Sequence, residues 1–190
     1  MVFGRSFTTI RLSKYDLKAD LDMWSIHHGH SSFSDYLNKR VSYKKESDTR
    51  YNTDNTRMVK RLCTDAYSEV MIYHFSGGIY KPNFEVGQSK KYNLADFSHI
   101  GINMGLKSAS IENCHLIQKP EKVKYPELLV HIDSKNAYVD YIIHGVASIE
   151  VMKEHGSEDL VLSPTARNYK NGFDRYNLCM PIYSFAQLKQ

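Results

Sequence analysis

The sequence predicts an α+β or mixed α/β fold. Residues 54–75 show the strongest helical pattern, because apolar side chains recur there at every third or fourth position. After residue 78 the pattern changes to alternating apolar and polar residues interrupted by turn-forming residues, as in consecutive β-strands. Helical spacing returns over residues 149–155. A helix, a run of strands and a further helix are the order expected of α+β and mixed α/β domains.

The amino-terminal part of the chain predicts two helices. Apolar residues with helical spacing run from Leu12 to Ile26, Ser13 is suited to cap the start, and Gly29 follows the last apolar position. A second, shorter helix is predicted to begin at Ser34.

Residues 38–56 are the most polar stretch of the chain and predict a surface loop. The interpretation that this composition favours is a solvated linker. The alternative is a basic arm that contacts the phosphate groups of a nucleic acid. The cations of this arm are Lys39, Arg40, Lys44, Lys45 and Arg50.

The strands are expected in the segments where the period is two, separated by turns such as Lys81-Pro82-Asn83. These segments are 79–86, 92–97, 99–108, 113–119, 127–133 and 137–148. The remainder, 156–190, predicts irregular structure with a turn at Asn171-Gly172 and a short helical turn after Tyr183.

Composition excludes several classes of protein. Hydrophobic residues make up 42% of the 190 residues and charged residues 24%, which excludes a wholly disordered chain, a collagen-like fibre and a polytopic membrane protein. The amino terminus lacks the pattern of a secretory signal. Cys63, Cys114 and Cys179 are far apart, as expected of reduced thiols, and we expect a cytoplasmic protein. The net charge of +4 permits nucleic-acid contact without establishing it.

One stretch carries residue types suited to phosphodiester chemistry. If 99–108 is a strand, alternation turns Asn103, Gly105 and Lys107 to the polar face, opposite the apolar residues between them. Asp96 stands at the end of the preceding predicted strand. A carboxylate in such a place can hold a divalent cation, and the lysine can orient the nucleophile.

These residues resemble the PD-(D/E)xK nuclease superfamily, which includes many restriction endonucleases and phage-type and repair nucleases. The resemblance covers roughly residues 55–150: Glu69 on a helix, Ala95-Asp96-Phe97, Gly105-Leu106-Lys107-Ser108-Ala109, and the apolar strands that follow. It implies a restriction-endonuclease-like core with a mixed β-sheet flanked by helices. The expected division is an appendage with a basic loop, residues 1–50, and a nuclease-like core, residues 51–190.

The resemblance also implies a site, a cofactor and partners. Asp96, Lys107, Glu69 and Asn103 would be catalytic, and Asp96, Glu69 and Glu112 would hold Mg²⁺ or Mn²⁺. The implied partner is DNA, and a homodimer is expected because restriction-type enzymes often act as dimers. The implied setting is the cytoplasm of a bacterial or phage-infected cell, with no membrane.

The sequence departs from the family pattern at Gly105, where the acid of the acid-x-lysine triplet is expected. Three explanations stay open. Glu112 or Glu121 supplies the acid from a neighbouring element; Asn103 serves as a weaker ligand with Glu69 supplying the charge; or the chain has kept the fold for binding alone.

The leading hypothesis is therefore a metal-dependent DNA endonuclease. The alternative is a catalytically inactive nuclease-fold protein that binds DNA or a host protein, such as a phage-type inhibitor or anti-defence factor. A structural domain without a nucleic-acid role is the third reading, in which Asp96 forms a turn and Lys107 is merely solvated.

Two other motifs are interpreted as structural. His27, His28 and His30 cluster at a predicted helix end without a carboxylate or cysteine nearby, which favours a polar helix terminus. Asp133-Ser134-Lys135 is also an acid-x-lysine triplet, but the Asn136 that follows it favours a hairpin turn.

Overall fold

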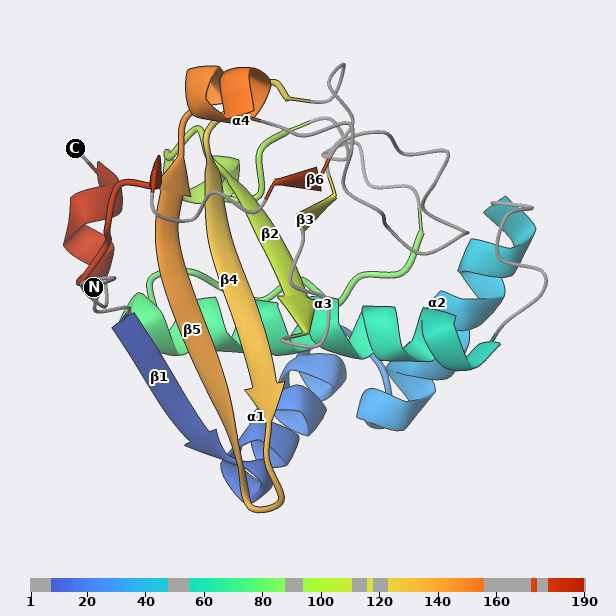
Figure 1. The fold of residues 1–190 in the computed structure, drawn as a ribbon. Coiled ribbons are helices and arrows are strands. Elements are labelled where there is room, and N and C mark those ends of the chain that lie inside the picture. The colour runs from blue at the N-terminus through green and yellow to red at the C-terminus, as the bar shows by residue number, and fades with distance from the viewer. Residues whose placement is uncertain are drawn as a thin grey trace. The chain divides into compact units, whose positions relative to one another are not determined.

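The computed structural model describes residues 8–47, 55–87, 94–110, 116–117, 123–155, 172–173 and 178–189. They form an α+β fold that contains a four-stranded mixed sheet, as the sequence predicts (Figure 1). The chain divides into two compact units. The helical unit comprises residues 11–94 and 135–139, and the sheet unit comprises residues 1–10, 95–134 and 140–190.

The described part of the helical unit contains three helices, α1 (Lys14–His27), α2 (Phe33–Ser47) and α3 (Asn55–Phe75). Ser13 caps α1 as predicted, because its hydroxyl oxygen accepts a hydrogen bond from the backbone N–H of Asp16 at 3.0 Å. Helices α2 and α3, on either side of residue 50, both belong to this unit. The expected division into an appendage, residues 1–50, and a nuclease-like core, residues 51–190, stays a prediction.

The prediction of a loop over residues 38–56 is wrong in its first half, because α2 continues to Ser47. Two interactions stabilise this helix despite its polar composition. Lys39 pairs with Asp35 one turn earlier, at 2.8 Å. On the inner side of the helix, the ring of Tyr36 stacks on Phe84 with a centroid distance of 4.8 Å. The cations Lys39, Arg40, Lys44 and Lys45 therefore lie on a helix, and Arg50 lies outside the described residues.

The four-stranded sheet has the order β1 (Thr8–Ser13), β5 (Tyr138–Ala147), β4 (Glu127–Ser134) and β2 (Gly105–Ser110). Figure 1 shows β2 beside β4, and the two run parallel in the register Gly105↔Glu127 through Ser110↔Ile132. The strands predicted at 127–133 and 137–148 are confirmed, whereas β1 was not expected. Nearly every residue of β4 is buried, which explains its apolar run.

Several of the other predicted strands are wrong. Residues 79–86 have no regular structure, and residues 94–97 lie in turns. Residues 98–100 form a 3₁₀ helix, η2 (Ser98–Ile100), so the strand predicted at 99–108 begins only at Gly105. The reason is the left-handed Gly101, with φ +81°, which turns the chain back so that the N–H of Phe97 donates to the carbonyl of Met104 at 3.0 Å. In the segment 113–119, only β3 (Leu116–Ile117) is described, and it pairs antiparallel with β6 (Gly172–Phe173).

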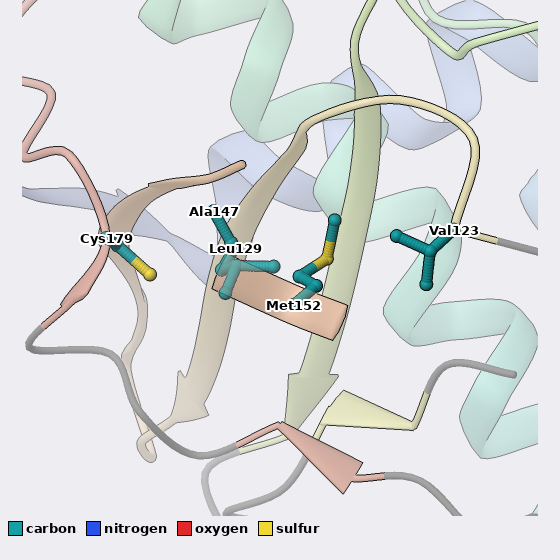
Figure 2. Close-up of a cluster of buried hydrophobic side chains, with 5 residues drawn as sticks. All are labelled: Val123, Leu129, Ala147, Met152 and Cys179. Atoms are coloured by element: carbon teal, nitrogen blue, oxygen red, sulfur yellow. The ribbon is translucent and has the colours of Figure 1, made fainter. Parts of the chain in front are cut away.

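The carboxyl-terminal helical predictions are confirmed by α4 (Ile149–His155) and η6 (Phe185–Lys189). Figure 2 shows a buried apolar cluster of the sheet unit in which Met152 of α4 gathers with Leu129 of β4. This cluster consists of Val123, Leu129, Ala147, Met152 and Cys179. Partly buried Ala109 of β2 packs against it, so the cluster marks the face of the sheet that α4 covers.

Within the described part of the chain, no helix is long and apolar enough to cross a membrane.

Candidate functional site

The turn before β2 holds Asp96 at the start of that strand. Phe97 is completely buried and anchors the turn, while Asp96 beside it is exposed. The Oδ2 atom of Asp96 accepts a hydrogen bond from the backbone N–H of Leu106 at 2.6 Å. Because Gly105 donates its N–H to Pro126 on the β4 side, Leu106 points its N–H toward the edge of β2 opposite β4. Asp96 thus stands at this edge, next to the residue that precedes Lys107.

A second carboxylate reaches the same end of β2 from the neighbouring strand. Glu127 is the register partner of Gly105 and is only 1% exposed. A Cβ atom added at position 105 would lie 2.7 Å from the carboxyl carbon of Glu127 and 3.0 Å from its Oε1 atom. The Glu127 carboxylate therefore occupies the space that a side chain at position 105 would need.

Lys107 projects from the face on which the Glu127 carboxylate lies. Alternation along β2 places Gly105, Lys107 and Ala109 on one face, and Ala109 packs against the apolar cluster that contains Leu129. Leu129 is in turn the register partner of Lys107. The lysine is half-buried, with its stem beside apolar neighbours, an arrangement that lets the charged end reach water.

Of the predicted site residues, Asp96 is hydrogen-bonded to the backbone of Leu106, the neighbour of Lys107 in the chain. Asn103 does not lie on a strand, contrary to the predicted alternation; it is an exposed residue of the irregular segment 101–104 that precedes β2. Glu112 and Glu121 lie outside the described residues.

Glu69 belongs to the helical unit, where its carboxylate ties α3 to the following segment. Its Oε2 atom accepts hydrogen bonds from the hydroxyl of Tyr80 and from the backbone N–H of Asn83, the latter at 3.4 Å. The half-buried side chain of Glu69 therefore connects residues 80–83 to α3. Its action as a metal ligand stays a prediction.

Glu127 is the residue that sequence reasoning missed. Its signal was an acid at the head of an otherwise apolar buried strand, where charged side chains are rare. The matching signal was Gly105, a glycine inside a strand, which often marks a close approach by another group. The parallel pairing of β2 with β4 joins the two signals, and no local pattern reveals that pairing.

The donor set fits a hard divalent cation better than a structural metal. Among the described residues, no group of three or more His, Cys, Asp or Glu side chains is placed to hold a metal ion. Asp96 and Glu127 offer carboxylate oxygens, and Mg²⁺ typically takes only one or two protein carboxylates and keeps several waters. The residues at the start of β2 are thus compatible with Mg²⁺ or Mn²⁺.

The histidines at the end of α1 have structural roles. The Nδ1 atom of His28 donates to the carbonyl of Trp24 at 2.8 Å, and the Nε2 atom of His30 donates to the carbonyl of Phe84 at 2.9 Å. These contacts agree with a polar helix terminus. The Asp133-Ser134-Lys135 triplet leads into the turn that joins β4 to β5, where the N–H of Lys135 donates to the carbonyl of Tyr138 at 2.9 Å.

Comparison of this chain with family models, with curated proteins and with solved structures returns no match.

Proposed function

We propose that this chain is a metal-dependent endonuclease that hydrolyses phosphodiester bonds in DNA. The observation that carries the proposal is the hydrogen bond from the N–H of Leu106 to the carboxylate of Asp96. It sets an exposed carboxylate beside Leu106, the residue before Lys107, near the start of β2, which pairs in parallel with β4. An acid and a lysine in this relation are the parts that phosphodiester hydrolysis with a divalent cation requires.

In this proposal, Asp96 holds Mg²⁺ or Mn²⁺ through its carboxylate. The bound cation would polarise the phosphate and lower the pKa of a coordinated water. In this proposal Lys107, which follows the hydrogen-bonded Leu106, orients the attacking oxygen and stabilises negative charge on the phosphate. The exposure of Asp96 leaves room for a phosphodiester to approach. Roles for Asn103, Glu69 and Glu112 follow from the family resemblance alone.

The basic residues of α2 support DNA as the substrate. Lys44 and Lys45 lie in the last turn of the helix. Lys39 and Arg40 lie on the same helix. We assign the phosphate contacts to these four cations, because positive charges of this kind are attracted to the DNA backbone.

A second function, binding of DNA or a host protein without cleavage, is favoured by a specific observation. No three-ligand group for a metal exists among the described residues, and Gly105 supplies no acid. A fold of this kind can retain its binding surface after losing its chemistry.

Cleavage of supercoiled plasmid DNA with Mg²⁺ or Mn²⁺ tests the proposal. We expect Asp96→Asn to lower the cleavage rate by at least about 100-fold, because the amide can still accept the hydrogen bond from Leu106 but binds a divalent cation poorly. The matched control is Glu154→Gln, which removes an exposed carboxylate from α4 and should leave the rate unchanged. If Asp96→Asn cleaves like the wild-type protein, the proposal is wrong. If the wild-type protein shifts DNA on a gel and never cuts it, the binding function replaces it.

A further inference from the structure

We propose that Glu127 is the second metal-holding carboxylate of this site, supplied by β4 in place of the acid missing from position 105 of β2. This inference rests on the proposed function, and it concerns a residue that the family pattern does not include. It also explains why the acid-x-lysine triplet of this chain begins with glycine.

The first step is positional. The carboxyl carbon of Glu127 lies 2.7 Å from the place of a Cβ at position 105. An aspartate at 105 would put its own carboxyl carbon about 1.5 Å from that Cβ, one carbon–carbon bond away. The two carboxylates would thus fall in the same small region, just above the start of β2. The carboxylate of Glu127 therefore lies near the place that the carboxylate of an aspartate at position 105 would take.

The second step is that the glycine leaves room for the carboxylate of Glu127. The two residues are register partners in a parallel pair, and the N–H of Gly105 donates to the carbonyl of Pro126 at 2.9 Å, so their separation is fixed by the backbone. Any side chain at position 105 would collide with the Glu127 carboxylate. Glycine is therefore the residue that lets an acid on β4 occupy the site. Its presence does not by itself mark a dead site.

The third step concerns charge. Glu127 is 1% exposed, and a carboxylate withdrawn from water to this degree is stable only with hydrogen-bonding or cationic neighbours. Lys107 projects from the same face, and Leu129, the next residue on that face of β4, belongs to the apolar cluster. A divalent cation beside Glu127 and Asp96 would be held in surroundings that strengthen its attraction to the two carboxylates.

A first measurement uses the wild-type protein without DNA. Substoichiometric Mn²⁺ is titrated into ¹⁵N-labelled protein, and paramagnetic broadening of the backbone amide signals is followed. We expect the amides of Gly105, Leu106 and Glu127 to broaden first, before those of Glu150 and Lys153 on α4. If the signals of Gly105 and Glu127 are the last to change, the inference is wrong.

A second measurement relocates the acid. Mn²⁺ binding is measured by calorimetry for Glu127→Gln, for the double variant Gly105→Asp/Glu127→Gly and for the control Glu154→Gln, with circular dichroism as the check of folding. We expect Glu127→Gln to weaken Mn²⁺ binding at least tenfold and the double variant to restore it to within about threefold of the wild type. A loss of about tenfold or more is the size expected when a group that supports a bound metal is removed.

The outcomes separate this inference from the proposed function. Unchanged Mn²⁺ affinity in folded Glu127→Gln overturns the inference, even if Asp96→Asn abolishes cleavage and so upholds the nuclease. If Glu127→Gln does not fold, the double variant decides, because restored binding supports the relocation and a folded double variant without binding overturns it. If neither folds, the broadening measured on the wild-type protein decides.

Discussion

The Nδ1 atom of His131 on β4 lies 2.6 Å from the Nε2 atom of His144 on β5. Both rings are buried and meet edge to face, with an interplanar angle of 89° and a centroid distance of 4.8 Å. One proton lies between the two nitrogens, so one ring donates and the other accepts. The pair joins the two strands through their side chains as well as their backbones.

We expect His144→Ala to lower the free energy of unfolding by about 2–3 kcal/mol, because it leaves a cavity and a buried nitrogen of His131 without this partner. Urea unfolding monitored by circular dichroism measures the change. His155→Ala, at the exposed end of α4, is the control and should change stability by less than about 0.5 kcal/mol. Equal effects of the two substitutions would show that the buried pair contributes nothing of its own.

Gly145→Ala should be among the most destabilising small substitutions in the chain. Gly145 has φ +121°, and an added Cβ would lie 2.9 Å from the carbonyl carbon of Met180, whose backbone pairs with Val146. We expect a loss of about 2–4 kcal/mol from overpacking and backbone strain together. The control is Gly29→Ala, which has a positive φ but no atom within 4 Å and should lose only about 1 kcal/mol. Thermal unfolding of both variants checks the difference, and a smaller loss at position 145 than at position 29 contradicts it.

Asp22 should stabilise the protein in a pH-dependent way. Its carboxylate accepts a hydrogen bond from the N–H of Phe33, the first residue of α2, at 2.9 Å. That bond, assisted by Lys18, holds the pKa of Asp22 below its ordinary value of 3.8 against the opposing effect of desolvation. Since the folded-state pKa is the lower one, the stabilisation is present above pH 3.8 and disappears as the pH falls through the folded-state pKa.

The test of Asp22 compares Asp22→Asn with the wild type by urea unfolding at several pH values. We expect a loss of about 1 kcal/mol at pH 6, typical of a weakened helix cap, and a smaller loss under strongly acidic conditions. A loss that stays constant across this range would mean that the charge of Asp22 is irrelevant.

DNA affinity should depend steeply on salt if α2 contacts phosphates. Each neutralised phosphate contributes a log–log slope of about −0.9. Replacing Lys44 and Lys45 with alanine should flatten the slope by about two units and weaken binding to all sequences alike. Fluorescence anisotropy with duplex DNA at several salt concentrations measures both, with the α1 variant Lys14→Ala/Lys18→Ala as the control. If the α1 variant changes the slope as much as the α2 variant, α2 has no special role.

The parts of the fold that sequence predicted well are those whose signal is local. The apolar stripe of α3, the cap at Ser13 and the apolar runs of β4 and β5 each depend on neighbours a few residues away. The apolar alternation through Ile102 and Met104, by contrast, gave the appearance of a strand where the chain turns at Gly101. In this segment, burial alternates because the turn packs two side chains inward, without a ladder of hydrogen bonds.

In the candidate site, too, only the residues with a local sequence signal could be predicted. Asp96 and Lys107 could be chosen from residue type and spacing, because they lie close together along the chain. Glu127 could not, because its relation to Gly105 is created by the parallel pairing of β2 with β4. Neither strand alone reveals this pairing, and without it the signals at Gly105 and Glu127 cannot be connected.

The order in which this site assembles follows from the connections between its strands. β4 and β5 are joined by a short turn, so their hairpin forms through a local encounter. β2 reaches β4 only after the long connection between Ser110 and Glu127 has closed, and loop closure of that kind slows folding. We therefore expect Gly105 to meet Glu127 only after the β4–β5 hairpin has formed, so that the site would be completed late in folding.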